Sequence, residues 1–294
     1  MIWIPITIGA ATLQVARNAL QRGLLAGAGP WGATLVRFLF GLPFSLAFAG
    51  VAFAVWPSAH PTFVPMFWIA SALGGATQIT ATAAMLVSMR RSTFALGTAF
   101  QQSSIPMAAF IGLALGENIG ALGWAGLFLV TGGLFTLAWP RKLAVGPRDW
   151  SAALLGLVAG AGFAISSNAY RQAALGLDAA HPVLAALITV FCVQAMQTTA
   201  LTAWLALRDR PALRAVASAW RSSLGAGFFG AAASGLWFTA FALSPAGPVR
   251  AVGVVEMPIA AIAGQRLFAE RLSTLQIIAA LVTAAGVVMA AIGS

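Results

Sequence analysis

Apolar segments of about 20 residues follow one another along this 294-residue chain, with little polar sequence between them. A helix of that length is long enough to cross the hydrocarbon core of a bilayer. Only 7% of the residues are charged, whereas roughly a quarter are charged in a soluble domain. So few charges cannot cover a surface that faces water, and the sequence therefore predicts an all-α integral membrane protein.

We expect ten transmembrane helices, because helix breakers and charged residues interrupt the apolar sequence at regular intervals. The polar connection 208–221 is the longest, and it can form a short interfacial helix. The predicted spans are 3–22, 31–55, 62–89, 93–116, 119–139, 150–172, 183–206, 222–243, 247–268 and 272–292.

The positive charges divide unequally between the two sides that alternating spans create. Of the 16 lysine and arginine residues, all but Arg171 and Arg250 fall on one side. Positive residues stay on the cytoplasmic side, so both termini are predicted to face the periplasm of a bacterial inner membrane. Arg17 and Arg37 lie a few residues inside their spans, and their heads are expected to reach the interface. The net charge of +10 thus indicates topology rather than a nucleic-acid partner.

One sequence element occurs twice. The pattern Pro-x-Ala-Ala-x-x-Gly begins at Pro106 and again at Pro258, 152 residues later, and a glutamate follows each copy, at Glu117 and Glu270. Such self-similarity at a fixed separation indicates a duplicated structural unit.

A Leu-Val-Thr triplet recurs at the same separation, at 129–131 and 281–283. Each half of the chain holds five predicted spans, an odd number, so the second copy enters the membrane upside down. The sequence therefore predicts two inverted five-helix repeats, 1–140 and 150–294, around a central cavity. A cytoplasmic linker, 141–149, joins them.

These features resemble the EamA-type drug/metabolite transporters. The resemblance rests on ten spans in two five-span copies, a proline in the fourth and ninth spans, and a glutamate after each of those spans, followed by a glycine-rich helix. It covers the whole chain, which is most similar to the bacterial aromatic amino acid exporters of that superfamily. It implies export from the cytoplasm and a cavity lined by spans one, three, four, six, eight and nine.

Polar side chains within these spans are candidate substrate-binding residues, because polar groups at membrane depth usually face the bundle interior or a wet cavity. Pro106 cannot donate a backbone hydrogen bond, so we expect it to leave the carbonyl of Gln102 unpaired and exposed. The alternative is a polar seam in which such side chains hydrogen-bond between helices. The candidate cavity residues are Gln78, Thr82, Met85, Thr98, Gln101, Gln102, Phe163, Ser166, Ser167, Trp237, Phe241 and Glu256, while Asn18, Pro106 and Pro258 are assigned to gating or packing.

Glu256 is the only carboxylate so deep in a predicted span. It is a candidate for binding a substrate ammonium group, for carrying a coupling proton, or for a structural hydrogen bond. The aromatic candidates Phe163, Trp237 and Phe241 suit a flat hydrophobic side chain, although such residues also fill cores or face lipid. The resemblance places span seven outside the cavity, so its polar residues, Gln194 to Thr199, are treated as packing residues.

The sequence favours a secondary transporter over an enzyme or a channel. The spans contain no histidine and one deep glutamate, too few groups for an intramembrane enzyme, and no charge ring or filter repeat indicates a channel. We expect an exporter of amino acids, aromatic ones first, with threonine, homoserine, purine derivatives or toxic cations as alternative substrates. No cofactor and no metal are expected. The partners are lipid and a small-molecule substrate, and the expected state is a monomer, with a dimer as the alternative.

The predicted cavity holds an acidic group but no deep cation. Sugar phosphates are therefore disfavoured, because they need lysine or arginine at the site. We therefore expect a helix end, or a backbone amide freed near Pro258, to bind the carboxylate of a zwitterionic substrate.

Overall fold

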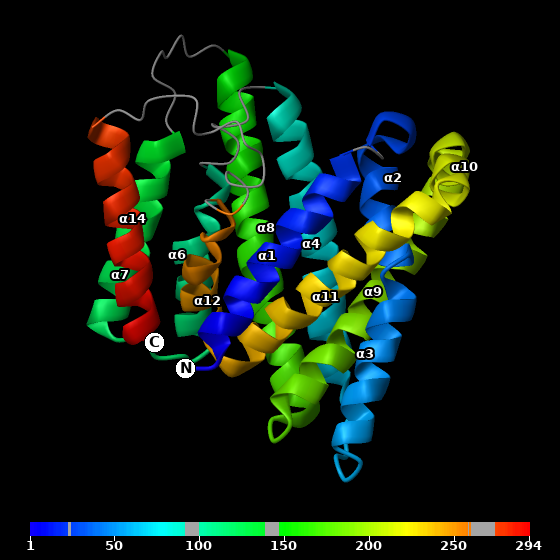
Figure 1. Cartoon of the computed structure of the whole chain (residues 1–294), viewed down its shortest axis with the longest axis horizontal. Helices are drawn as coiled ribbons and strands as arrows, with labels where there is room; N and C mark the ends of the chain where they lie inside the picture. Colours follow the sequence, from blue (N-terminus) through cyan, green and yellow to red (C-terminus); the bar gives the residue numbers. More distant parts are fainter. Residues whose placement is uncertain (23–24, 92–99, 139–146, 258, 260–273) are drawn as a thin grey trace. The chain divides into compact units, whose positions relative to one another are not determined.

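A computed structural model describes residues 1–22, 25–91, 100–138, 147–257, 259 and 274–294. Throughout these residues the chain is built from helices, with no strand (Figure 1). The helices are α1 (Trp3–Arg22), α2 (Leu25–Leu39), α3 (Leu42–Val55), α4 (Pro65–Arg91), α6 (Ser104–Ala114), α7 (Ala121–Ala138), α8 (Pro147–Asp178), α9 (Pro182–Arg208), α10 (Arg210–Ser218), α11 (Trp220–Leu243), α12 (Ala246–Gly253) and α14 (Thr274–Ile292).

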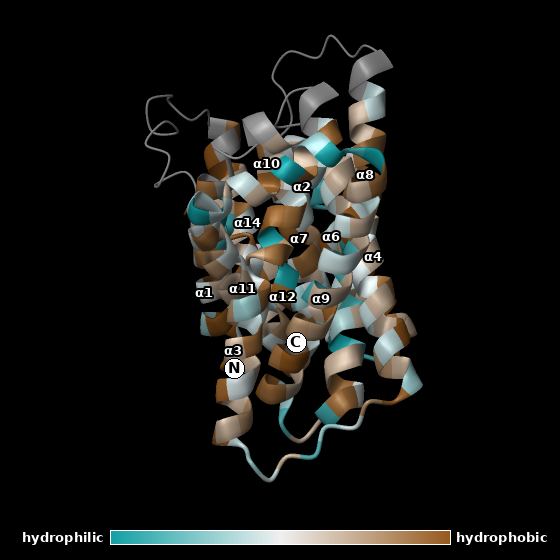
Figure 2. Cartoon of the chain, turned by 90° about the vertical axis from the view of Figure 1, so that its right-hand side faces the viewer, coloured by the Kyte–Doolittle hydropathy of each residue, from teal (hydrophilic) through white to brown (hydrophobic). Residues whose placement is uncertain are grey.

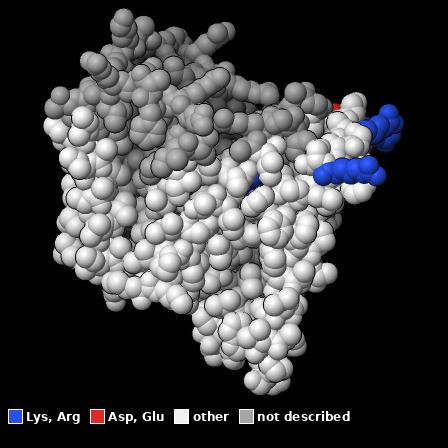
Figure 3. Space-filling model, in the orientation of Figure 1, with Lys and Arg blue, Asp and Glu red and all other residues white. Residues whose placement is uncertain are grey.

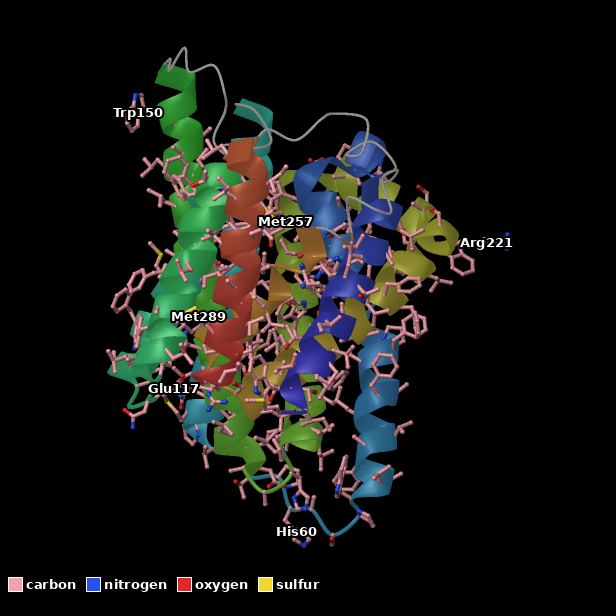
Figure 4. The ribbon with its side chains drawn as sticks, turned by 60° about the vertical axis from the view of Figure 1, so that its left-hand side comes forward. His60, Glu117, Trp150, Arg221, Met257 and Met289 are labelled. Atoms are coloured by element: carbon pink, nitrogen blue, oxygen red, sulfur yellow. The ribbon has the colours of Figure 1, made fainter. Side chains whose placement is uncertain are left out.

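Several of these helices are long and apolar enough to span a membrane. Within the described residues, four stretches meet this condition, namely Trp31–Val55, Trp150–Asp178, Pro182–Arg208 and Trp220–Leu243, and several shorter apolar helices accompany them. Hydrophobic residues predominate along the helices (Figure 2). Large apolar side chains remain exposed, and Trp150 projects away from α8 (Figure 4). The all-helical, membrane-type class is confirmed, whereas the count of ten spans stays a prediction.

The second predicted span is two helices rather than one. α2 ends at Leu39 and α3 begins at Leu42, with a turn at Phe40 and Gly41 between them. Pro43 lies at the start of α3, and its missing N–H cannot donate to the carbonyl four residues earlier. The helical hydrogen-bond ladder is therefore interrupted at this point, which the sequence analysis did not predict.

The predicted short helix in the polar connection is confirmed. α10 occupies Arg210–Ser218, and the side chain of Asp209 caps its N-terminus by accepting a hydrogen bond from the Ala212 amide at 3.1 Å. Ala212 and Val216 are buried, whereas basic side chains project outward in the region of α10 and the start of α11 (Figure 3). α10 is therefore amphipathic, as expected for an interfacial helix.

The helices form two compact units that interleave along the chain. Unit 1 contains Met1–Ile79 and Ala169–Leu243, and unit 2 contains Thr80–Asn168 and Ser244–Ser294. Each unit therefore draws on both predicted repeats, and α4 and α8 contribute residues to both units. α8 begins at Pro147, so the last residues of the predicted linker are helical. The boundaries of the sequence repeats stay a prediction.

In unit 1, α1 packs along α11, and both α2 and α3 pack against α9. One core cluster is built around Tyr170 and Phe238, whose stacked rings have centroids 4.0 Å apart. A second cluster joins α2 to α9 and α10 through Leu35, Leu205 and Val216. Apolar packing therefore fixes the helices that carry the polar residues of this unit.

In unit 2, α7 packs along α14, and α6 packs against α12. The α7–α14 pair is so close that a Cβ atom at Gly286 would lie 2.7 Å from the Val130 amide nitrogen and 2.8 Å from the Gly126 carbonyl oxygen. Only glycine allows this approach, as in other helix pairs that associate in membranes through small residues.

The duplicated element has the same local structure in both copies. Before Pro106, the amides of Ser103 and Ile105 donate to carbonyls three residues earlier, at 3.2 and 3.1 Å. At positions 152 residues later, Val255 and Met257 do the same, at 3.2 and 2.9 Å. Both helices therefore tighten from α-helical to 3₁₀ spacing immediately before the repeated proline.

The triplets of the repeat also match. The hydroxyls of Thr131 and Thr283, on α7 and α14, each donate to the carbonyl four residues earlier, Leu127 and Ala279, at 2.8 Å. The similarity between the two halves thus extends from residue identities to individual hydrogen bonds.

Candidate functional site

Arg250 joins three helices of unit 2. From α12, its Nε donates to Ser167 Oγ at 3.2 Å, its Nη1 to Ser104 Oγ at 3.3 Å, and its Nη2 to the Phe163 carbonyl at 2.9 Å. The guanidinium carbon also lies 5.4 Å from the centroid of the Phe163 ring. Ser104 is the first residue of α6 after the helix break, so Arg250 connects this break to α8.

The other polar residues on this part of α8 bind backbone. Asn168 donates to the Ala108 carbonyl on α6 and to the Ala164 carbonyl on its own helix, both at 3.0 Å. Ser166 is buried, and its hydroxyl donates to the Phe163 carbonyl at 3.0 Å. Of the predicted cavity residues in α8, Phe163 and Ser167 meet at Arg250, whereas Ser166 turns toward its own helix.

The carbonyl of Gln102 is not unpaired. It accepts a hydrogen bond from the Ile105 amide at 3.1 Å, because the tightened turn lets this amide reach a carbonyl that proline cannot serve. The expectation of an exposed carbonyl at this position is therefore wrong. The side chains of Gln101 and Gln102 are half-buried at the break, and Glu256 is half-buried just after the corresponding break at 254–255.

Two predicted site residues, Thr98 and Pro258, lie outside the described residues. Thr82 and Met85 are half-buried on α4, and Asn18 is exposed on α1. Asn18 Oδ1 accepts hydrogen bonds from Arg17 at 3.2 and 2.8 Å, and the roles of all three residues stay predictions.

In unit 1, Gln78 is part of a hydrogen-bonded group of three helices. Its Oε1 accepts a hydrogen bond from Gln197 Nε2 at 2.8 Å and lies 3.0 Å from the Tyr170 hydroxyl. The same hydroxyl lies 2.8 Å from the Gly74 carbonyl, and Gln197 also donates to the Gly75 carbonyl at 3.2 Å. For the Gln78 oxygen, this geometry matches the alternative of a polar seam between helices.

Trp237 and Phe241 form an aromatic pair on α11. Their rings are stacked with centroids 5.7 Å apart, and Trp237 Nε1 donates to Gln14 Oε1 on α1 at 3.2 Å. Phe241 is buried, while Trp237 is half-buried. The pair therefore presents an aromatic face whose one polar atom is already oriented by α1.

A solved crystal structure of another protein resembles this chain. The similarity covers 99% of this chain and 96% of the other, with a TM-score of 0.67 and 16% sequence identity. The two chains share a fold. The sequence matches no family model and no curated protein.

Arg171 and Arg250, the two arginines that the sequence analysis assigned to the side with few charges, both bind helix carbonyls. Arg171 Nη1 donates to the carbonyls of Phe241 and Ala242, at 2.5 and 3.1 Å, in the last turn of α11. A cation at this position satisfies terminal carbonyls and complements the helix dipole. Both arginines thus lie within helices, and neither is a loop charge.

Sequence reasoning missed Arg250, Tyr170 and Gln197 as parts of these polar groups. Arg250 was counted only as a topology signal, and Gln197 was assigned to packing outside the cavity. A usable signal was present for the arginine, because a charge within an apolar stretch is costly and usually functional or paired. Among the described residues, no group of three or more His, Cys, Asp or Glu side chains could hold a metal.

Proposed function

We propose that this chain is a secondary transporter of the EamA-type drug/metabolite superfamily. In this proposal it lies in a bacterial inner membrane with both termini in the periplasm. It exports amino acids, aromatic ones first, by alternating access of two inverted five-helix repeats.

The observation that carries the proposal is the helix break that recurs before Pro106 and Pro258. Secondary transporters commonly combine inverted repeats with discontinuous helices near the bilayer midplane, where unwound backbone and helix ends can meet substrate. In this chain the break at 102–103 and the break at 254–255 have matching hydrogen bonds. This correspondence supports a duplicated transporter architecture more directly than the sequence pattern does.

The side chains near the breaks and in unit 1 support an amino acid as the substrate. In unit 2, Phe163 offers aromatic surface beside the guanidinium of Arg250 at the first break. In unit 1, Trp237 and Phe241 form a stacked aromatic pair. Apolar surface with few, well-placed polar groups suits a small ligand that has one flat hydrophobic end. These features support the aromatic branch of the proposal.

The test is counterflow by the purified protein in liposomes, with a panel of aromatic, aliphatic and hydroxy amino acids. Saturable exchange of an aromatic amino acid is the expected result. Transport of only threonine, homoserine, a purine derivative or a cation would replace the proposed substrate. Flux that does not saturate would contradict a carrier and indicate a channel.

A further inference from the structure

Arg37 lies well inside an apolar span of unit 1. It is six residues beyond the start of the span Trp31–Val55, and helical rise places it about 9 Å along that span. The turn at Phe40–Gly41, which separates α2 from α3, follows three residues later. A permanently charged side chain at this depth calls for a physical explanation.

The stem of Arg37 lies against α11 at Gly230. A Cβ atom at position 230 would be 3.3 Å from Arg37 Cγ and 3.5 Å from Arg17 Cδ. Two arginine stems thus meet on one glycine, and a larger side chain there would displace them. Arg17 directs its guanidinium to Asn18 Oδ1, with hydrogen bonds of 3.2 and 2.8 Å.

The Nε atom of Arg37 lacks a hydrogen-bond partner in the part of the chain that the structure describes. This atom is buried, and no described carboxylate forms an ion pair with Arg37. The ring of Phe38 lies 5.1 Å from its guanidinium carbon. Nε is therefore enclosed by protein, while the expectation that the Arg37 head reaches the interface stays a prediction.

A second unpartnered polar group faces the same helix break. Gln194 on α9 is 2% exposed, and neither atom of its amide has a hydrogen-bond partner among the described residues. Its Oε1 lies 3.4 Å from the place that a Cβ atom on Gly41 would take, and that place is 2.6 Å from the Arg37 carbonyl oxygen. Buried amides in native proteins are normally hydrogen-bonded, so this orphan also points to a ligand.

We propose that Arg37 binds the carboxylate of the transported amino acid and that Gln194 is a second hydrogen-bond donor near it. The inference rests on the proposed transport function and supplies the cation that the sequence analysis did not find for a zwitterion. The planar fork of a guanidinium matches a carboxylate with two parallel hydrogen bonds.

The test compares phenylalanine with phenethylamine, the same molecule without its carboxylate. Purified protein in phosphatidylcholine liposomes exchanges labelled phenylalanine, and each unlabelled compound competes. For the wild type we expect phenethylamine to compete about tenfold less well or worse, the loss typical of a hydrogen bond to a charged group. In Arg37→Gln, competition by phenylalanine should weaken by a similar factor, and competition by phenethylamine should not change. Arg37→Lys should recover part of the loss.

The matched control is Arg221→Gln, because Arg221 is exposed and points away from the helices (Figure 4). This variant should retain the wild-type preference. The inference would be overturned if phenylalanine and phenethylamine competed equally well in the wild type, or if Arg37→Gln still distinguished the two compounds. Neither result would contradict the proposed transport function. If Arg37→Gln does not fold, the wild-type preference and Arg37→Lys decide the question. A wild type that exchanges no amino acid would overturn both proposals.

Discussion

At the scale of single residues, Arg250 and Gln78 show how a charged or an amide group inside the helices is held by neutral partners. Arg250 donates to two serine hydroxyls and a backbone carbonyl, and Gln78 accepts from Gln197. Each hydrogen bond of this kind offsets part of the cost of removing a polar group from water. Because these partners come from different helices, the polar residues fix which helix faces meet as well as what the interior can bind.

Glu256 offers a test of proton coupling at this scale. Glutamine has nearly the same shape as protonated glutamic acid and cannot exchange a proton, so Glu256→Gln should make transport nearly independent of pH if this carboxyl carries the coupling proton. The measurement is the initial rate of counterflow across a pH series at matched protein levels.

Glu117→Gln is the matched control for that measurement. Glu117 lies in the connection between α6 and α7 (Figure 4), and its replacement should leave the pH profile as in the wild type. A Glu256→Gln protein with an unaltered profile would remove this residue from the coupling mechanism and leave it a structural role.

The residues could be predicted in part. A glutamine or serine within an apolar span can be recognised from sequence as a buried polar group, and Gln78 and Ser167 were chosen on that ground. Their partners could not be predicted, because Gln197 is 119 residues from Gln78 and Arg250 is 83 residues from Ser167. No local pattern encodes contacts across such separations.

At the scale of elements, prolines and glycines decide where helices break and how closely they pack. The sequence predicted a disturbance at Pro106 from the missing donor, but not the 3₁₀ turn that lets the Ile105 amide satisfy the Gln102 carbonyl. The outcome depends on how the backbone relaxes around the proline, which composition does not specify. The break before Pro43 was missed, because the apolar sequence continues through it without a change in hydropathy.

Two glycines of the α7–α14 pair provide a matched comparison of packing. A methyl group at Gly286 would press on the backbone of α7, whereas a methyl group at Gly132 meets no atom within 4 Å. Gly286→Ala should lower the free energy of unfolding by about 1–3 kcal/mol, as overpacking does. Gly132→Ala should be neutral or stabilising, since alanine favours a helix by up to about 1 kcal/mol over glycine.

Thermal unfolding in detergent, measured for both variants and the wild type under identical conditions, distinguishes these outcomes. Equal stability of the two variants would mean that α7 and α14 do not pack as closely in the membrane protein as the structure indicates.

At the scale of the whole molecule, the sequence repeats and the compact units divide the chain differently. The repeat splits the chain near its middle, whereas each compact unit combines segments from both halves. Sequence similarity records duplication, and compactness records which helices pack together, so the two divisions need not agree. Only the repeat could be found from sequence, because packing between distant segments leaves no periodic signal.

Membrane topology gives the final prediction, because it follows from the distribution of charge over the whole chain. Exposed arginines cluster at the ends of α9 and α11 and on α10, and positive residues stay in the cytoplasm. Cysteines introduced at Ile2 and Ser294, in a Cys192→Ser background, should therefore react with an impermeant reagent added outside intact inner-membrane spheroplasts. Arg214→Cys on α10 is the internal control and should react only after permeabilisation.

Labelling of one terminus from each side would require an odd number of spans, which is incompatible with two five-helix repeats. Labelling of both termini from the cytoplasm alone would keep an even number but reverse the direction of every helix.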